Sequence, residues 1–174
     1  MPLKAICRML CAAALLVAAL VAPADAGAQA VDEDTLRAAF VVNFLRYTEW
    51  PAQSVAPGEP LVVLVVGGDR SSALVRKMAE AAGEHSGRPI VVRRARLPAT
   101  LQKARRELQQ RMASVHAVFV AEADAEVAAA VIEIARDRPV LTIGVGDAFV
   151  RAGGMLALIR EGAHITFASN VNAI

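Results

Sequence analysis

The 174-residue sequence is poor in cysteine, and the cysteines that it has lie close to its start. They are Cys7 and Cys11, and no cysteine occurs after residue 30. A protein that begins after residue 30 therefore has no disulfide, no thiol nucleophile and no thiolate metal site. Its stability has to come from its hydrophobic core.

The first 30 residues resemble a secretory signal peptide. Lys4 and Arg8 precede an apolar run, which is followed by the small-residue motifs Ala24-Asp25-Ala26 and Ala28-Gln29-Ala30. We therefore predict a cleaved signal peptide over residues 1–30. The apolar run is shorter than the roughly 20 residues that span a bilayer, which disfavours the alternative, a retained membrane anchor.

The rest of the sequence, residues 31–174, has the length of one domain and contains no apolar run long enough to cross a membrane. The whole chain carries 19 Lys and Arg residues against 17 Asp and Glu residues. Because this charge is nearly balanced, we expect no general attraction to nucleic acid. The expected location of the exported protein is the periplasm.

Strand-like and helix-like patterns alternate along this domain. Apolar runs rich in valine and isoleucine predict strands at 61–66, 89–93, 115–120 and 140–143. Helices are predicted at 35–48, 71–82, 99–112 and 123–135, and a final hairpin at 155–159 and 164–167. The alternation predicts a single α/β domain: a mixed, mostly parallel sheet of about six strands, with helices on both faces and a C-terminal antiparallel hairpin.

No catalytic motif accompanies this fold. There is no P-loop, and the segment 144–149 has two glycines of a dinucleotide fingerprint but Phe149 in place of the third. No serine lies in a nucleophile elbow. The three histidines, His85, His116 and His164, lack metal-ligand spacing, and His116 is best explained as a hydrogen-bonded core residue. We therefore expect neither an enzyme nor a bound cofactor or metal.

Aromatic residues are scarce, yet four of the seven lie in the stretch 40–51, FVVNFLRYTEWP. Phe40, Phe44 and Tyr47 follow Leu36 at helical spacing, so they share one helix face, and Trp50 comes just after the helix. Apolar residues fill much of the remaining circumference. Such a helix is either covered completely by its own domain or docks a partner through one face.

The turn after the first predicted strand is a candidate anion site. Gly67 and Gly68 would allow close approach of a ligand, while Arg70, Ser71 and free N–H groups at the helix start could hold a negative group. The alternative is an ordinary tight turn in which Asp69 caps the helix.

A basic segment follows. Residues 88–111 contain eight Lys and Arg residues and the single acid Glu107, whereas acids dominate residues 122–137. This polarity could direct the protein toward anionic lipid headgroups or an acidic partner. The alternative is a solvated helix face without a ligand.

The domain resembles the YfiR-like family of periplasmic proteins. The resemblance starts with Leu36–Phe40, Asn43-Phe44 and Glu49-Trp50-Pro51. It continues in order through 61–67, 140–143, 153–155 and 165–170. Relatives often have disulfide-forming cysteines, which are absent here. They also usually continue into a C-terminal helix, whereas this sequence stops at Ile174, so either this member is short or its sequence is truncated.

The resemblance implies regulation without catalysis. The expected function is repression of an inner-membrane diguanylate cyclase through its periplasmic part, which would control cyclic di-GMP and biofilm formation. An outer-membrane OmpA-like lipoprotein that sequesters the regulator, and a homodimer, are the other implied partners. We assign partner binding to Phe40, Phe44, Tyr47 and Trp50. The alternative function is a periplasmic protein that binds a small ligand, an anion or a nucleotide, at the turn described above.

Overall fold

The computed structural model describes residues 32–51, 53–56, 58–84 and 87–173. The predicted signal peptide lies outside these residues. The described residues belong to one compact unit, Val31–Ile174.

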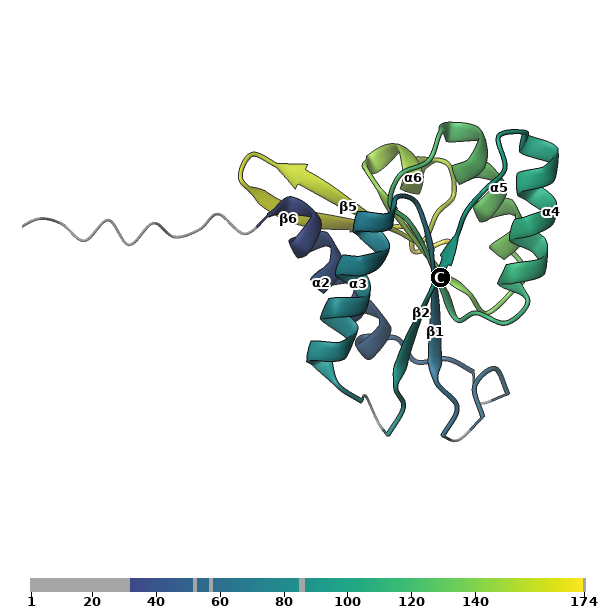
Figure 1. The fold of residues 1–174 in the computed structure, drawn as a ribbon. Coiled ribbons are helices and arrows are strands. Elements are labelled where there is room, and N and C mark those ends of the chain that lie inside the picture. Colours follow the sequence, from purple (N-terminus) through teal and green to yellow (C-terminus); the bar gives the residue numbers. More distant parts are fainter. Residues whose placement is uncertain (1–31, 52, 57, 85–86, 174) are drawn as a thin grey trace, which may run out of the picture. The chain divides into compact units, whose positions relative to one another are not determined.

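Six strands form a single sheet in the order β2-β1-β3-β4-β5-β6 (Figure 1). Strands β1 to β5 are parallel, and β6 runs antiparallel to β5. This arrangement confirms the predicted fold class, including the final hairpin. The strands are β1 Leu61–Val66, β2 Ile90–Ala95, β3 Ala117–Val120, β4 Leu141–Val145, β5 Leu156–Glu161 and β6 His164–Ser169.

Helices connect the parallel strands and precede the first of them. They are α2 Glu33–Tyr47, α3 Asp69–Ala82, α4 Leu101–Met112, α5 Ala125–Ala135 and α6 Asp147–Arg151. The sequence patterns missed α6, because its five residues are too short to show helical periodicity. It completes a fourth parallel crossover between β4 and β5.

Strand β1 is the centre of the structure, and all six of its residues are buried. Its even-numbered residues belong to one hydrophobic core and its odd-numbered residues to another. Successive side chains of a strand point to opposite faces, so a strand of uniform apolar character needs a helical layer on each side.

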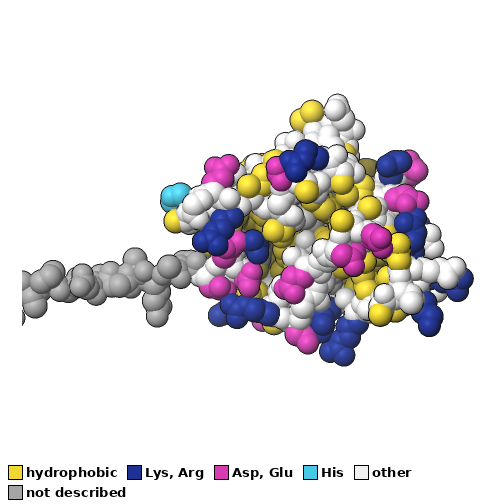
Figure 2. Space-filling view, turned by 90° about the horizontal axis from the view of Figure 1, so that it is seen from above, with side chains coloured by type: hydrophobic (Ala, Val, Ile, Leu, Met, Phe, Trp, Pro, Cys, Tyr) yellow, Lys and Arg dark blue, Asp and Glu magenta, His cyan; other side chains and the backbone are white. Residues whose placement is uncertain are grey.

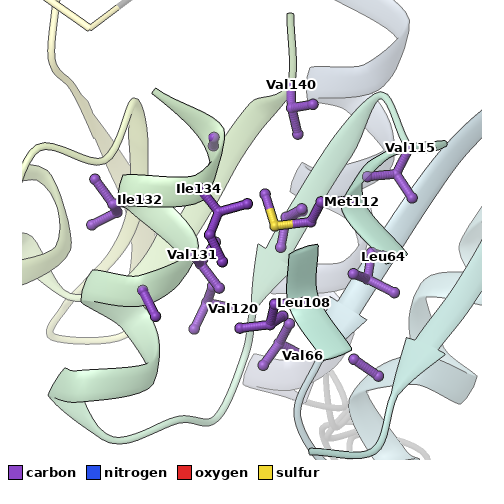
Figure 3. Packing of buried hydrophobic residues seen from close by; sticks show 14 of the residues in the cluster. Leu64, Val66, Leu108, Met112, Val115, Val120, Val131, Ile132, Ile134 and Val140 are labelled. Atoms are coloured by element: carbon purple, nitrogen blue, oxygen red, sulfur yellow. The ribbon is translucent and has the colours of Figure 1, made fainter. Parts of the chain in front are cut away.

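One face is covered by α4 and α5 (Figure 3). Helix α4 is polar overall, but Ala104, Leu108 and Met112 recur every four residues and are all buried. Leu108 and Met112 pack with Val131 of α5 and with Leu64 of β1. A single apolar stripe is thus sufficient to attach this charged helix to the sheet.

The other face is covered by α2 and α3. Helix α3 contributes Val75 and Ala79, and α2 contributes four buried residues: Ala38, Val41, Val42 and Leu45. After Tyr47 the helix ends, and the Thr48 hydroxyl donates a hydrogen bond to the carbonyl oxygen of Phe44 at 2.7 Å.

In the segment 144–149, which resembles a dinucleotide fingerprint in sequence, an aromatic ring fills the space beside the glycine. Phe149 of α6 is buried and lies against Gly144 of β4 and Gly154 before β5. A Cβ atom added at Gly144 would be 2.2 Å from the Phe149 ring. These two glycines therefore have a packing role, because they have no side chains and so leave space for the Phe149 ring.

We expect the substitution Gly144→Ala to lower the free energy of unfolding by about 1 to 3 kcal/mol, because the added methyl group overpacks a buried site. Urea unfolding followed by circular dichroism would measure the loss. Adding Phe149→Leu should recover part of it, since the smaller side chain leaves room for the new Cβ atom. Fully additive losses in the double variant would contradict this packing account.

Candidate functional site

Helix α2 is neither fully covered nor free. Its buried residues face the sheet and α3, while Leu36, Phe40 and Phe44 on the other side are only half-buried. Of the two alternatives left open by the sequence, complete coverage by the domain itself is therefore wrong for the described residues.

Phe40 and Phe44 meet a third ring, that of Phe167 on β6. The ring centroids are 6.0 Å apart for Phe40 and Phe44, 6.5 Å for Phe40 and Phe167, and 5.3 Å for Phe44 and Phe167. The last pair is edge-to-face, a favoured geometry for aromatic side chains. Phe167 is 52% exposed. We call these three residues the aromatic patch.

Sequence reasoning did not include Phe167, because it lies more than 120 positions from Phe40. The signal that could have revealed it is the alternation in β6. Ile165 and Phe167 share one face of that strand, and Ile165 packs into the core beneath α2. Only the hairpin register, which pairs Phe167 with the buried Leu158, places this face under the helix.

Tyr47 lies one turn beyond Phe44 at the end of α2 and is 84% exposed. A tyrosine side chain is large and rigid and carries both an apolar ring and a hydroxyl group. Residues of this type often dominate protein–protein contacts. Its helical spacing places Tyr47 on the same face of α2 as Phe40 and Phe44.

Trp50 behaves differently from the other three predicted partner-binding residues. It is half-buried, and its Nε1–H donates a hydrogen bond to the carbonyl oxygen of His116 at 3.1 Å. The two rings also meet edge-to-face, with centroids 6.2 Å apart. Trp50 therefore anchors the segment after α2 to the start of β3.

His116 is held by its own hydrogen bond. Its Nδ1 accepts from the backbone N–H of Val62 at 2.9 Å, which confirms the expected structural role. Burial lowers the pKa of His116, an effect that exceeds the opposing influence of a hydrogen bond to the Ser54 backbone. Protonation would place a hydrogen on a nitrogen that now accepts one.

The predicted anion site has a different geometry from the one expected. The Ser71 hydroxyl donates to Glu122 Oε1 at 3.0 Å, and a Cβ atom on Gly68 would be 3.0 Å from Glu122 Oε2. A Cβ atom on Gly67 would be 3.1 Å from the backbone nitrogen of Glu122. The carboxylate of Glu122, which follows β3, thus already lies beside the start of α3.

Arg70 does not join Gly67, Gly68 and Ser71. Its Nε donates to Asp34 Oδ2 at 3.0 Å, and its Nη2 contacts Asp32. These hydrogen bonds to Asp34 and Asp32 raise the pKa of Arg70. The arginine ties the start of α3 to the start of α2, so the four predicted ligand-binding residues do not converge on one open position.

The expected helix cap at Asp69 is wrong. Gly68 is the N-cap residue and Asp69 is the first residue of α3, where its carboxylate pairs with Arg94 and Arg96. Asp69 therefore takes part in a group of charged residues at the end of β2.

A comparison with protein families identifies the chain. The sequence profile of the DUF4154 family, described as YfiR/HmsC-like, matches residues 34–174. The chain belongs to the YfiR/HmsC-like family. The match confirms the predicted resemblance. A comparison with curated proteins finds no match.

Several solved structures are similar to this YfiR/HmsC-like domain at low sequence identity. A glucose-galactose binding protein from Geobacillus stearothermophilus, GanP, has 15% identity over 75% of this chain and 49% of its own, with a TM-score of 0.49. A periplasmic ribose ABC transporter from Conexibacter woesei has 16% identity over 74% and 45%, also at 0.49. A conserved domain protein from Vibrio cholerae has 15% identity over 72% and 40%, at 0.44. The YfiR/HmsC-like chain spans less than half the length of each of these proteins.

Among the described residues of this YfiR/HmsC-like domain, the helices are all too short or too polar to span a membrane. The same part of the chain contains no group of three or more potential metal ligands from His, Cys, Asp and Glu.

We predict that acid destabilises this protein partly through His116. Because its pKa is lower in the folded state, the unfolded chain binds more protons, so stability should fall as the pH drops through about 6.5 and below. Urea unfolding at pH 7.5 and pH 5.5 would measure this. His116→Asn, whose amide oxygen can accept from Val62, should show a smaller difference between the two pH values. An equal difference in both proteins would contradict the role of His116.

Proposed function

We propose that this protein is a non-catalytic periplasmic regulator that binds the periplasmic part of an inner-membrane diguanylate cyclase and represses it. Membership of the YfiR/HmsC-like family supports regulation in cyclic di-GMP signalling. The observation that favours a specific binding surface is the half-exposed aromatic patch of Phe40, Phe44 and Phe167, to which we add the exposed Tyr47 on the same helix.

The energetics of this surface favour a protein partner. Burying a large apolar side chain contributes roughly 1.5 to 3 kcal/mol, and the domain has gained only part of this for Phe167 and very little for Tyr47. The patch is already ordered by α2 and the β5–β6 hairpin, so binding would cost little conformational entropy. A partner that covers these rings gains the remaining burial.

The position of the aromatic patch in the fold indicates which residues a partner would contact. Helix α2 and β6 meet at one edge of the sheet, since β6 is the last strand in the sheet order. We propose that Phe40, Phe44, Phe167 and Tyr47 form the contact surface. Trp50 acts as a positioning residue through its hydrogen bond to His116.

Two other partners belong to the proposal. An OmpA-like outer-membrane lipoprotein would release the cyclase by competing for the regulator, and a homodimer would be a further state of the protein. Light scattering of the purified protein, with and without Tyr47→Ala, would test whether the same surface also holds two copies together.

We expect Tyr47→Ala and Phe167→Ala each to weaken binding to the periplasmic domain of a neighbouring membrane diguanylate cyclase by tenfold or more, about 1.4 kcal/mol. Both side chains are exposed, so the fold should survive. Binding would be measured by calorimetry, and repression by cellular cyclic di-GMP.

The matched control is Val91→Ala, which removes an exposed apolar side chain from β2 at the opposite edge of the sheet. It should change the affinity less than twofold. Binding that is unaffected by the patch variants would exclude the patch, and absence of any cyclase binding would overturn the proposed function.

A further inference from the structure

Four arginines line a hollow of about 480 Å³ at the carboxyl end of β2. They come from three elements: the middle of α3, the end of β2 with the residue after it, and the last turn of α4. Three residues at the start of α3 complete the lining. The arginines are Arg76, Arg94, Arg96 and Arg111, and the other residues are Asp69, Ser72 and Ala73. We call this the arginine hollow.

The position of β2 explains why these side chains gather. It is one of the two edge strands of the sheet, so α3 on one face and α4 on the other approach each other around its free side. Arg94 pairs in register with Val65, whose side chain belongs to the α2 and α3 face. Arg111 reaches from α4 and donates through Nη1 to the carbonyl oxygen of Arg94 at 3.3 Å.

The charges in the arginine hollow are not balanced. Asp69 is the only acidic residue that lines it, and this one carboxylate pairs with both Arg94 and Arg96, the latter at 3.7 Å. Arg111 donates to Glu107 at 2.5 Å. No ion pair within 4.0 Å involves Arg76 in the described part of the chain. Four guanidinium groups thus face two carboxylates.

We propose that the arginine hollow binds a phosphate-bearing ligand. A phosphate group carries at least one negative charge and at least two unesterified oxygens, so it can accept from guanidinium groups that approach from different elements. Asp69 Oδ1 marks such a position, because two arginines already converge on that single oxygen. The side chains of Asp69 and Arg96 are 78% and 79% exposed, so the position is accessible from solvent.

The same chemistry is offered by a soluble phosphate compound and by the headgroup of an anionic phospholipid. Figure 2 looks down on the end of the sheet where β1 leads into α3, and Lys and Arg side chains lie along its rim among Asp and Glu.

The arginine hollow lies at β2 and the aromatic patch at β6, the two opposite edges of the sheet. A phosphate ligand and a protein partner would therefore not compete for one surface.

The test uses the purified protein with two probes: inorganic pyrophosphate, followed by calorimetry, and vesicles of phosphatidylglycerol or phosphatidylcholine, followed by cosedimentation. We expect saturable binding that weakens at least tenfold in the double variant Arg76→Gln/Arg96→Gln. The control Arg136→Gln/Arg138→Gln removes the same charge from exposed positions after α5 and should change binding less than twofold.

A third variant tests the role of Asp69 as an internal competitor. Asp69→Asn frees Arg94 and Arg96, so the affinity for the phosphate probe should rise about threefold or more. Circular dichroism would verify that each variant is folded.

Binding of pyrophosphate assigns a soluble phosphate compound, and binding of phosphatidylglycerol vesicles alone assigns a lipid headgroup. The proposal is overturned if neither probe binds, if the two double variants lose affinity equally, or if Asp69→Asn weakens binding.

Discussion

The structure depends on the burial of β1 on both of its faces. A strand whose six residues are all apolar cannot lie at a surface, so it requires α4 and α5 on one side and α2 and α3 on the other. The sheet order, with β1 between β2 and β3, follows from the crossovers that supply these helices. The two ends of the sheet are then left to β2 and β6, and both surfaces proposed for binding lie at these edges.

Helix α2 packs on the sheet with one set of residues and carries aromatic rings at the sheet edge with another. Its small and branched residues, Ala38, Val41, Val42 and Leu45, pack closely on the sheet, while the larger rings of Phe40 and Phe44 lie toward the edge. There they meet Phe167 of the hairpin and are only partly covered. The same helix therefore completes the core and leaves an ordered apolar surface partly exposed.

Carboxylates of the protein occupy the positions where sequence reasoning expects a ligand. Glu122 lies beside the Gly67-Gly68 turn, and Arg70 is paired with Asp32 and Asp34. Asp69 plays a similar part between Arg94 and Arg96, but there the guanidinium groups outnumber the acids. This difference in balance separates a structural ion pair from a candidate anion site.

The sequence alone determined the fold class, because continuous apolar strands alternating with helix patterns have few other solutions. It also identified the family and the helix that carries the aromatic residues. Only the tertiary structure decided that Phe167 joins Phe40 and Phe44, that Trp50 is an anchor, and that Arg70 faces α2. Helical and strand periodicities specify which residues share a face of one element. Contacts between elements depend on strand register and helix packing, which bring together residues far apart in the chain.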